Sequence, residues 1–150
     1  MRTILITGGT GLVGKALVKQ LVQKNYKVII LTRSIKDYKI EESVSYALWN
    51  VKENSIDVDA VKKADAIIHL AGAGVVDKKW TPSYKKEIKE SRTKSSELLL
   101  KTLKNNVHKV QVIVSASAIG WYGADKIPGH YFTENEKADN AFLGEVCKEW

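Results

Sequence analysis

At 150 residues, of which 44% are hydrophobic, the chain is large enough to bury one core, while its single cysteine excludes an internal disulfide framework and is typical of a reducing compartment. No apolar run approaches the roughly 20 residues of a membrane span, and Met1-Arg2 leads directly into an expected strand, so we expect a cytoplasmic protein without a membrane partner. The net charge is +7, but the lysines are scattered over expected helix faces, which favours a solvated basic surface over a nucleic-acid partner.

The first motif is a glycine-rich turn between an apolar strand and an amphipathic helix. The strand is expected over 3–6, the helix over 15–21, and the turn has the spacing G-x-x-G-x-x-G. Gly8 suits a tight turn, Gly11 lets backbone amides approach a phosphate, and Gly14 lets the helix pack closely on the strand. Glycines also cluster in ordinary turns, but this context favours a loop that binds the pyrophosphate of a nicotinamide dinucleotide.

The second expected strand, 26–31, ends in Thr32-Arg33-Ser34. At this position a carboxylate bonds the ribose 2′-hydroxyl of NAD, whereas a guanidinium holds the 2′-phosphate of NADP. Arg33, with hydroxyls at Thr32 and Ser34, therefore favours NADP(H), and no acidic residue follows before Asp37. The alternative interpretation of Arg33 is a solvated arginine at a strand end.

The middle of the chain continues the alternation of strands and helices. A polar loop is expected over 37–42, a strand over 45–49, a short helix over 57–62 and a buried strand over 65–70. The small residues at 71–74 let a dinucleotide lie close to the sheet edge, although a plain strand-to-loop turn explains them equally well.

A long helix over 82–103 and a fifth strand over 109–114 complete the alternation. This pattern predicts an α/β Rossmann fold, a doubly wound parallel sheet with strand order 3-2-1-4-5 and helices on both faces. Ligands bind such sheets at the carboxyl ends of the strands. Four segments are expected to reach that edge, at Gly8, Arg33, Leu70 and Ser117.

The histidines and the end of the chain support two further expectations. His69 lies in an apolar run and is expected in the core or near the cofactor, while His108 and His130 have no cysteine or carboxylate at ligand spacing, so no metal site is expected. Residues 142–150 have helical spacing without a stop signal. We therefore expect residues 1–150 to form one NADP-binding domain, an N-terminal fragment without the C-terminal substrate region.

Several stretches carry a resemblance to a known family. They are Thr-Gly-Gly-Thr-Gly-Leu-Val-Gly at 7–14, His-Leu-Ala-Gly at 69–72, Ser-Ala-Ser at 115–117 with Tyr-Gly at 122–123, Lys-Trp-Thr at 79–81 with residues 87–92, and Phe-Leu at 142–143 with Cys-Lys-Glu-Trp at 147–150. The chain resembles the extended short-chain dehydrogenase/reductases, the superfamily of NAD-dependent epimerases and dehydratases. The last two of these groups are similar to its atypical, sugar-nucleotide epimerase-like members.

The resemblance implies an NADP(H) site built from four segments. Its cofactor-binding residues would be Gly8, Thr10, Gly11, Leu12, Val13, Thr32, Arg33, Leu70, Ala71, Glu87 and Arg92. The guanidinium of Arg92 is chemically suited to a phosphate or ribose oxygen, whereas the role of Glu87 rests on the resemblance alone. The alternative for these two residues is an exposed pair on a charged helix.

The resemblance also implies a serine that orients the substrate oxygen, and a tyrosine four residues before a lysine. In that pair the ammonium lowers the phenol pKa from its usual value of about 10. Ser117, or with less support Ser115, fits the serine. The positions expected for the tyrosine and the lysine hold Phe142 and Val146, and neither side chain can exchange a proton.

Tyr122 is the remaining phenol with a candidate catalytic role, and Lys148 is the nearest amine to the expected lysine position. A shift of two residues rotates a helical side chain by about 200°, which takes Lys148 off the face of Val146 and argues against standard Tyr/Lys chemistry. The alternative is aromatic packing of Trp121 and Tyr122 over the nicotinamide pocket.

Two functions from different classes remain open. An NADP-dependent oxidoreductase or epimerase would act on a small carbonyl or sugar-like substrate, with Ser117 polarising the oxygen. A non-catalytic NADP(H)-binding sensor or interaction protein would account for Phe142 and Val146. A disfavoured third, nucleic-acid binding, predicts steeply salt-dependent affinity. A homo-oligomer is compatible with either leading function.

Overall fold

The computed structural model of the protein describes residues 1–35, 42–125 and 129–150, so Asp37 and all but the end of the predicted polar loop lie outside the described residues. A six-stranded sheet forms the centre of the fold. Its strands are β1 (Thr3–Thr7), β2 (Lys27–Thr32), β3 (Val44–Asn50), β4 (Ser55–Ile56), β5 (Ala66–His69) and β6 (Val112–Ser115). The helices are α1 (Leu12–Gln23), α2 (Val58–Lys63), α3 (Pro82–Asn105), α4 (Phe142–Glu149) and the short 3-10 helix η1 (Ile119–Trp121).

The five parallel strands lie in the order β3-β2-β1-β5-β6, which confirms the predicted order 3-2-1-4-5. The prediction missed β4, a two-residue strand antiparallel to the end of β3, because two residues carry no readable periodicity. The fifth strand begins at Val112 rather than at Lys109, whose ammonium instead pairs with Asp65 at 2.9 Å. Helix α1 begins at Leu12, three residues before the predicted start, so the glycine loop runs directly into its first turn.

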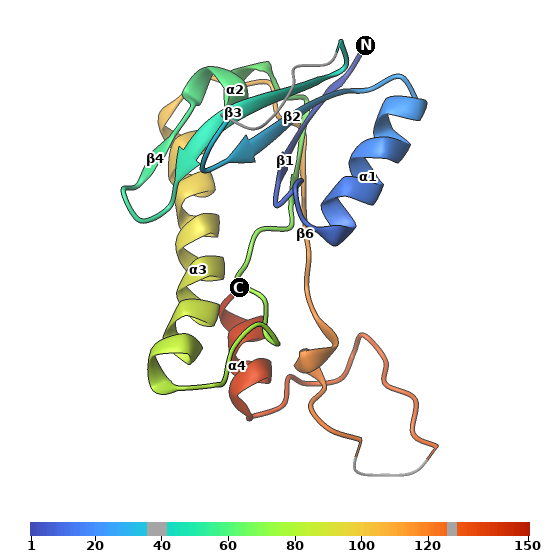
Figure 1. Cartoon of the computed structure of the whole chain (residues 1–150). Coiled ribbons are helices and arrows are strands. Elements are labelled where there is room, and N and C mark those ends of the chain that lie inside the picture. The colour runs from blue at the N-terminus through green and yellow to red at the C-terminus, as the bar shows by residue number, and fades with distance from the viewer. Residues whose placement is uncertain (36–41, 126–128) are drawn as a thin grey trace.

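Side chains of the sheet alternate between two apolar layers. Leu5, Ile29 and Ile67 lie in the layer covered by α2 and α3, whereas Ile4 and Ile6 lie in the layer covered by α1. One buried strand serves both layers because successive side chains of a strand point to opposite faces. The expected helices on both faces are therefore confirmed, with α1 on one side of the sheet and α2 and α3 on the other (Figure 1).

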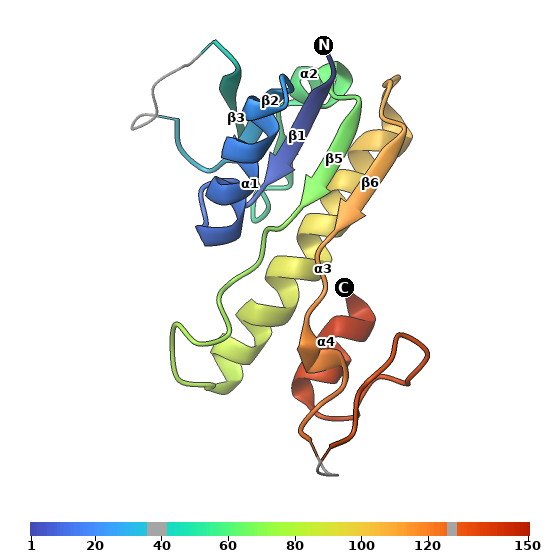
Figure 2. The ribbon, with the colours of Figure 1, turned by 90° about the vertical axis from the view of Figure 1, so that its right-hand side faces the viewer.

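Helix α3 continues past the carboxyl edge of the sheet, where it lies beside α4 (Figure 2). It begins at Pro82, and the hydroxyl of the N-cap residue Thr81 accepts a hydrogen bond from the Tyr84 amide at 3.2 Å. Its C-terminal half packs in the sheet core through Leu98, Leu99 and Leu103. Its N-terminal half shares a second apolar cluster with α4, formed by Tyr84, Ile88 and Val146 with the partly buried Val75 and Phe142.

Candidate functional site

The glycine loop lies at the carboxyl edge of the sheet and ends in an open helix terminus. Gly11 is the N-cap of α1, no side chain caps the helix, and its first turn carries no acidic residue. Leu12 and Val13, at the start of this helix, are 91% and 66% exposed. Uncapped amides at a helix N-terminus favour an anion, and the apolar side chains beside them offer contact area to a planar ring or a sugar.

Two glycines of this loop are required by its geometry. Gly8 has φ = +71°, and a Cβ there would lie 2.9 Å from the carbonyl carbon of Leu70, at the end of β5. A Cβ on Gly14 would overlap the Gly8 carbonyl oxygen. The loop therefore packs backbone to backbone against both α1 and the 70–71 segment. A Cβ on Gly11 would meet only the Gly8 oxygen, at 3.4 Å, so Gly11 is less crowded than Gly8 and Gly14.

Thr32 and Arg33 lie at the end of β2, next to β1 in the sheet. The Thr32 hydroxyl donates to the Ser34 carbonyl at 3.0 Å and accepts from the Ser34 amide at 3.4 Å, which closes a small turn around Arg33. The Arg33 side chain is exposed. Its place at the second strand end is the place expected for recognition of the ribose 2′ position.

The carboxyl ends of β1 and β5 hold a buried polar network that was not predicted from the sequence. The Thr7 hydroxyl lies 2.6 Å from His69 Nδ1 and accepts from the amides of Leu70 and Ala71, both at 3.1 Å. His69 Nε2 lies 3.1 Å from the hydroxyl of Ser95. His69 is 2% exposed, which confirms its expected core location, and burial lowers its pKa to about 4.

A sequence signal for this network did exist. Thr7 and His69 are partners in the parallel pairing of β1 with β5, and each is the last, polar residue of an apolar strand. Two buried polar residues at paired positions of neighbouring strands are expected to form a hydrogen bond with each other or with a third group. Ser95, from α3, could not be assigned in this way because nothing local to it indicates a partner.

The two predicted site residues of α3 have different surroundings. Glu87 is exposed and pairs with Lys78 at 3.6 Å. Arg92 is half-buried; its Nη1 donates to the carbonyls of Ala73 and Ile88 at 3.0 and 2.9 Å. The guanidinium also lies 4.9 Å from the ring centroid of Trp150. Arg92 thus ties the segment after β5 to α3 and to the end of the chain.

Ser117 and Tyr122 follow β6. Ser117 is exposed, and Ser115 donates to the neighbouring Ala116 carbonyl at 3.3 Å. Tyr122 is half-buried and stacks on Phe132 with ring centroids 4.9 Å apart. Aromatic packing of Tyr122 is therefore observed, against Phe132.

The positions expected for the catalytic tyrosine and lysine face α3. Phe142 lies 5.5 Å from Trp80 between ring centroids, and Val146 is 3% exposed among the side chains of the second apolar cluster. Leu143 and Cys147, each one residue after these positions, instead lie against the 118–120 segment. The apolar residues at 142 and 146 thus contribute to the packing of α4 on α3.

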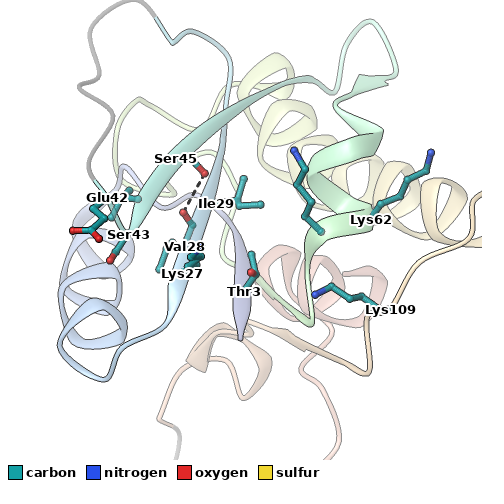
Figure 3. A pocket seen from close by; sticks show the side chains of 11 residues that line it. Thr3, Lys27, Val28, Ile29, Glu42, Ser43, Ser45, Lys62 and Lys109 are labelled. Atoms are coloured by element: carbon teal, nitrogen blue, oxygen red, sulfur yellow. Dashed lines mark hydrogen bonds between the residues drawn. The ribbon is translucent and has the colours of Figure 1, made fainter. Parts of the chain in front are cut away.

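Two hollows of about 600 Å³ lie in the described part of the chain, and His69 and Ser115 line one of them. One is at the amino ends of β1, β2 and β3, where Thr3, Lys27 and Lys109 line it (Figure 3). This is the end of the sheet opposite the glycine loop. The other lies between α3, β6 and Trp150, with Ile113 in its lining.

No helix in the described residues is both long and apolar enough to cross a membrane. Over the same residues, no cluster of three or more histidine, cysteine or acidic side chains is arranged to hold a metal ion.

The parallel sheet, the glycine loop at its topological switch point and the open terminus of α1 define a Rossmann-fold protein of the dinucleotide-binding class. The model of the NAD dependent epimerase/dehydratase family matches residues 4–142, and the chain belongs to this family.

Curated relatives come from bacteria and plants. An epimerase family protein of Staphylococcus haemolyticus is 38% identical over 153 residues, which cover 100% of this chain and 48% of the relative. The chloroplastic homologue of epimerase family protein SDR39U1 in Arabidopsis thaliana is 33% identical, over 99% of this chain and 43% of its own length. The chain spans about half the length of the curated relatives it matches.

Solved structures share the fold. The human epimerase family protein SDR39U1, described with NADPH, has a TM-score of 0.76 at 21% identity, covering 99% of this chain and 47% of that one. A nucleoside-diphosphate sugar epimerase of Corynebacterium glutamicum has a TM-score of 0.76 at 32% identity, covering 99% of this chain and 29% of that one. Other neighbours are described with NAD, among them MoeE5 with UDP-glucose.

Proposed function

We propose that the protein binds NADP(H) at the carboxyl edge of its sheet. The observation that carries this proposal is the uncapped N-terminus of α1, reached through a glycine loop in which a Cβ on Gly11 would meet only the Gly8 carbonyl oxygen. Gly8, Thr10, Gly11, Leu12 and Val13 would hold the pyrophosphate and its sugars, and Leu70 and Ala71 would lie under the nicotinamide half. The structure of human SDR39U1 with NADPH supports the same choice of cofactor.

Arg33 is the residue that we propose selects NADPH over NADH. Arg33→Asp is expected to weaken NADPH binding by about 10- to 100-fold and to leave NADH binding unchanged or stronger, because a carboxylate repels the 2′-phosphate. The measurement is a fluorescence titration of the full-length protein with each dinucleotide. Lys52→Asp, which makes the same charge change at an exposed turn, is the matched control. Equal loss of affinity in both variants would contradict a 2′-phosphate contact.

We further propose that the family member is an oxidoreductase or epimerase for a small carbonyl or sugar-like substrate. The bound nicotinamide supplies or accepts hydride. Ser117 is the exposed hydroxyl after β6 that would donate a hydrogen bond to the reacting oxygen, and Tyr122 is the nearest candidate phenol for proton transfer.

Ser117→Ala is expected to lower turnover by about 10- to 100-fold with an unchanged Kd for NADPH, because it removes a hydrogen bond to the reacting oxygen only. The measurement is NADPH oxidation with carbonyl substrates and epimer formation with nucleotide sugars, because an epimerase returns its cofactor unchanged. Ser115→Ala is the control, since its hydroxyl bonds the local backbone. Equal turnover in Ser117→Ala and the wild type would remove this serine from the mechanism.

The second candidate function is a non-catalytic NADP(H)-binding sensor or interaction protein. The packing of Phe142 and Val146 against α3 favours it, because the standard proton donor and its ammonium partner have been replaced by core residues. Tight NADPH binding with neither oxidation of the cofactor nor epimerisation of any substrate in the screen would support this function.

Compartment and partners complete the proposal. We propose a cytoplasmic protein that acts on a small molecule and has no nucleic-acid or membrane partner, and a homo-oligomer is compatible with this function. The Arabidopsis relative is named chloroplastic, so fractionation of the native cell is the direct test of the compartment.

A further inference from the structure

Residues 70–81, which connect β5 to α3, form neither strand nor helix, yet side chains of α3 bind their backbone. The Ala73 amide donates to the hydroxyl oxygen of Ser91 at 2.9 Å, and the Ala73 carbonyl accepts from Arg92 Nη1 at 3.0 Å. The Ser91 hydroxyl donates its own hydrogen to the Ile88 carbonyl at 3.0 Å, which leaves its oxygen as the acceptor for Ala73. Two adjacent residues of one helix therefore hold both backbone groups of a single loop residue.

The next two residues are held in a similar way. The Gly74 carbonyl accepts a hydrogen bond from the Tyr84 hydroxyl, and the Val75 carbonyl accepts one from the indole nitrogen of Trp80 at 2.6 Å. Tyr84 is 4% exposed and belongs to the apolar cluster shared by α3 and α4, so packing fixes the place of its hydroxyl. Side chains thus supply the partners that a strand or helix would otherwise give to this backbone.

The small residues at 72 and 74 make room for the contacts of this segment. A Cβ on Gly72 would lie 2.9 Å from Cζ of Arg92, so the guanidinium packs directly on the Gly72 backbone. A Cβ on Gly74 would overlap the carboxylate of Asp77. At these two positions, the space that a larger side chain would need is taken up by side chains of the protein itself.

The held backbone continues directly from the proposed cofactor site. Leu70 and Ala71, which we propose to lie under the nicotinamide half, precede it in the chain. Helix α3 is anchored in the sheet core by its C-terminal half and runs along the segment beyond the sheet edge (Figure 2). A segment tied to such an element is expected to keep one conformation with and without the cofactor.

We infer that Ser91 and Tyr84 are positioning residues, which hold the 73–75 backbone on α3 and so preform the wall of the site beside the nicotinamide half. Both act through the backbone, Ser91 at the Ala73 amide and Tyr84 at the Gly74 carbonyl. The inference rests on the proposed function, because it assigns these contacts a role in NADP(H) affinity. Binding of the adenosine half, at the glycine loop and Arg33, is not expected to depend on either hydroxyl.

The test compares two ligands in the full-length protein: NADPH, and adenosine 2′,5′-bisphosphate, which carries the 2′-phosphate but lacks the nicotinamide half. Ser91→Ala and Tyr84→Phe are each expected to weaken NADPH binding by about 3- to 10-fold, because each removes one hydrogen bond to the segment. Affinity for the bisphosphate is expected to stay at the wild-type value. Ser91→Thr, which keeps a hydroxyl, is expected to restore NADPH affinity. Isothermal titration calorimetry well below the melting temperature measures both ligands.

Two control variants change a hydroxyl outside the segment. Thr93→Ala removes one that donates to the Lys89 carbonyl within α3 at 3.3 Å, and Tyr26→Phe changes a partly buried tyrosine in the layer covered by α1. Both are expected to bind NADPH as the wild type does. Hydrogen exchange adds a measurement that needs no ligand: the Ala73 amide is expected to be protected in the cofactor-free wild type and to exchange about tenfold faster in Ser91→Ala.

The outcomes separate this inference from the proposed function. Either residue loses its positioning role if its variant binds NADPH as tightly as the wild type, or if NADPH and the bisphosphate lose affinity equally. An unprotected Ala73 amide in the wild type overturns the inference, and so does a wild type that binds the bisphosphate as tightly as NADPH; the cofactor site stands in each of these cases. If the wild type binds neither ligand, the proposed function fails, and the positioning role fails with it.

Discussion

Replacing Val146 by lysine is expected to lower the free energy of unfolding by about 3 kcal/mol or more, because the ammonium would be placed without a partner in an apolar cluster. Val146 is 3% exposed and packs with Tyr84 and Ile88 of α3. This substitution introduces the lysine that the resemblance leads one to expect, at the position where it is expected. It should therefore destabilise the protein rather than restore Tyr/Lys chemistry.

Chemical denaturation of the full-length protein measures this loss. Leu100→Lys is the matched control, because Leu100 is also an aliphatic residue on a helix but is half-exposed, and its change is expected to stay below about 1 kcal/mol. A stability for Val146→Lys within that same limit would mean that position 146 has access to water, and the lysine position would again be open to catalysis.

Acidification from pH 7 to pH 4 is expected to remove about 3 kcal/mol of folding stability through His69 alone. Burial lowers the pKa of His69 from 6.5 to about 4 in the folded chain. Below pH 6.5 the unfolded chain binds a proton that the folded chain does not, so protonation favours unfolding. The contribution is complete above about pH 6.5 and is lost progressively as the pH falls towards 4.

The measurement is the pH dependence of the free energy of unfolding in the wild type and in His69→Asn. The variant is expected to have a flatter curve between pH 6.5 and pH 4, with His108→Asn as the control for removing one imidazole at an exposed position. Parallel curves for the wild type and His69→Asn would show that His69 takes up a proton without unfolding. Asp65 contributes at lower pH, because the Thr3 amide and Lys109 lower the pKa of its carboxyl.

Most of the fold could be predicted because the information is local to each element. The apolar runs that became β1, β2 and β5 are long enough to read as buried strands, and Pro82 after Thr81 marks the start of α3. The errors in the prediction concern elements whose existence or bounds depend on tertiary contacts. β4 is defined by its pairing with the end of β3, and the last strand begins at Val112, where its pairing with β5 begins.

In the candidate site, too, some residues could be assigned from local sequence and others could not. The glycine loop and Arg33 are contiguous stretches of sequence, so local pattern was enough to assign them. The Thr7–His69–Ser95 network joins residues 62 and 26 positions apart: the pairing of β1 with β5 brings Thr7 to His69, and the packing of α3 on the sheet brings Ser95 to them. The departure at Phe142 and Val146 was visible in the sequence, but its physical reason, a shared cluster with α3, was not.

Helix α3 belongs to two hydrophobic clusters at once, one under the sheet and one beyond its edge. A single rod of 24 residues, about 36 Å long, therefore orders both. Because the helix is continuous, its C-terminal half in the sheet core also sets the direction of its N-terminal half, against which α4 and the partly buried Val75 pack. The conformational entropy lost in ordering the carboxyl-edge segments is smaller for that reason, and the edge is preorganised before any ligand arrives.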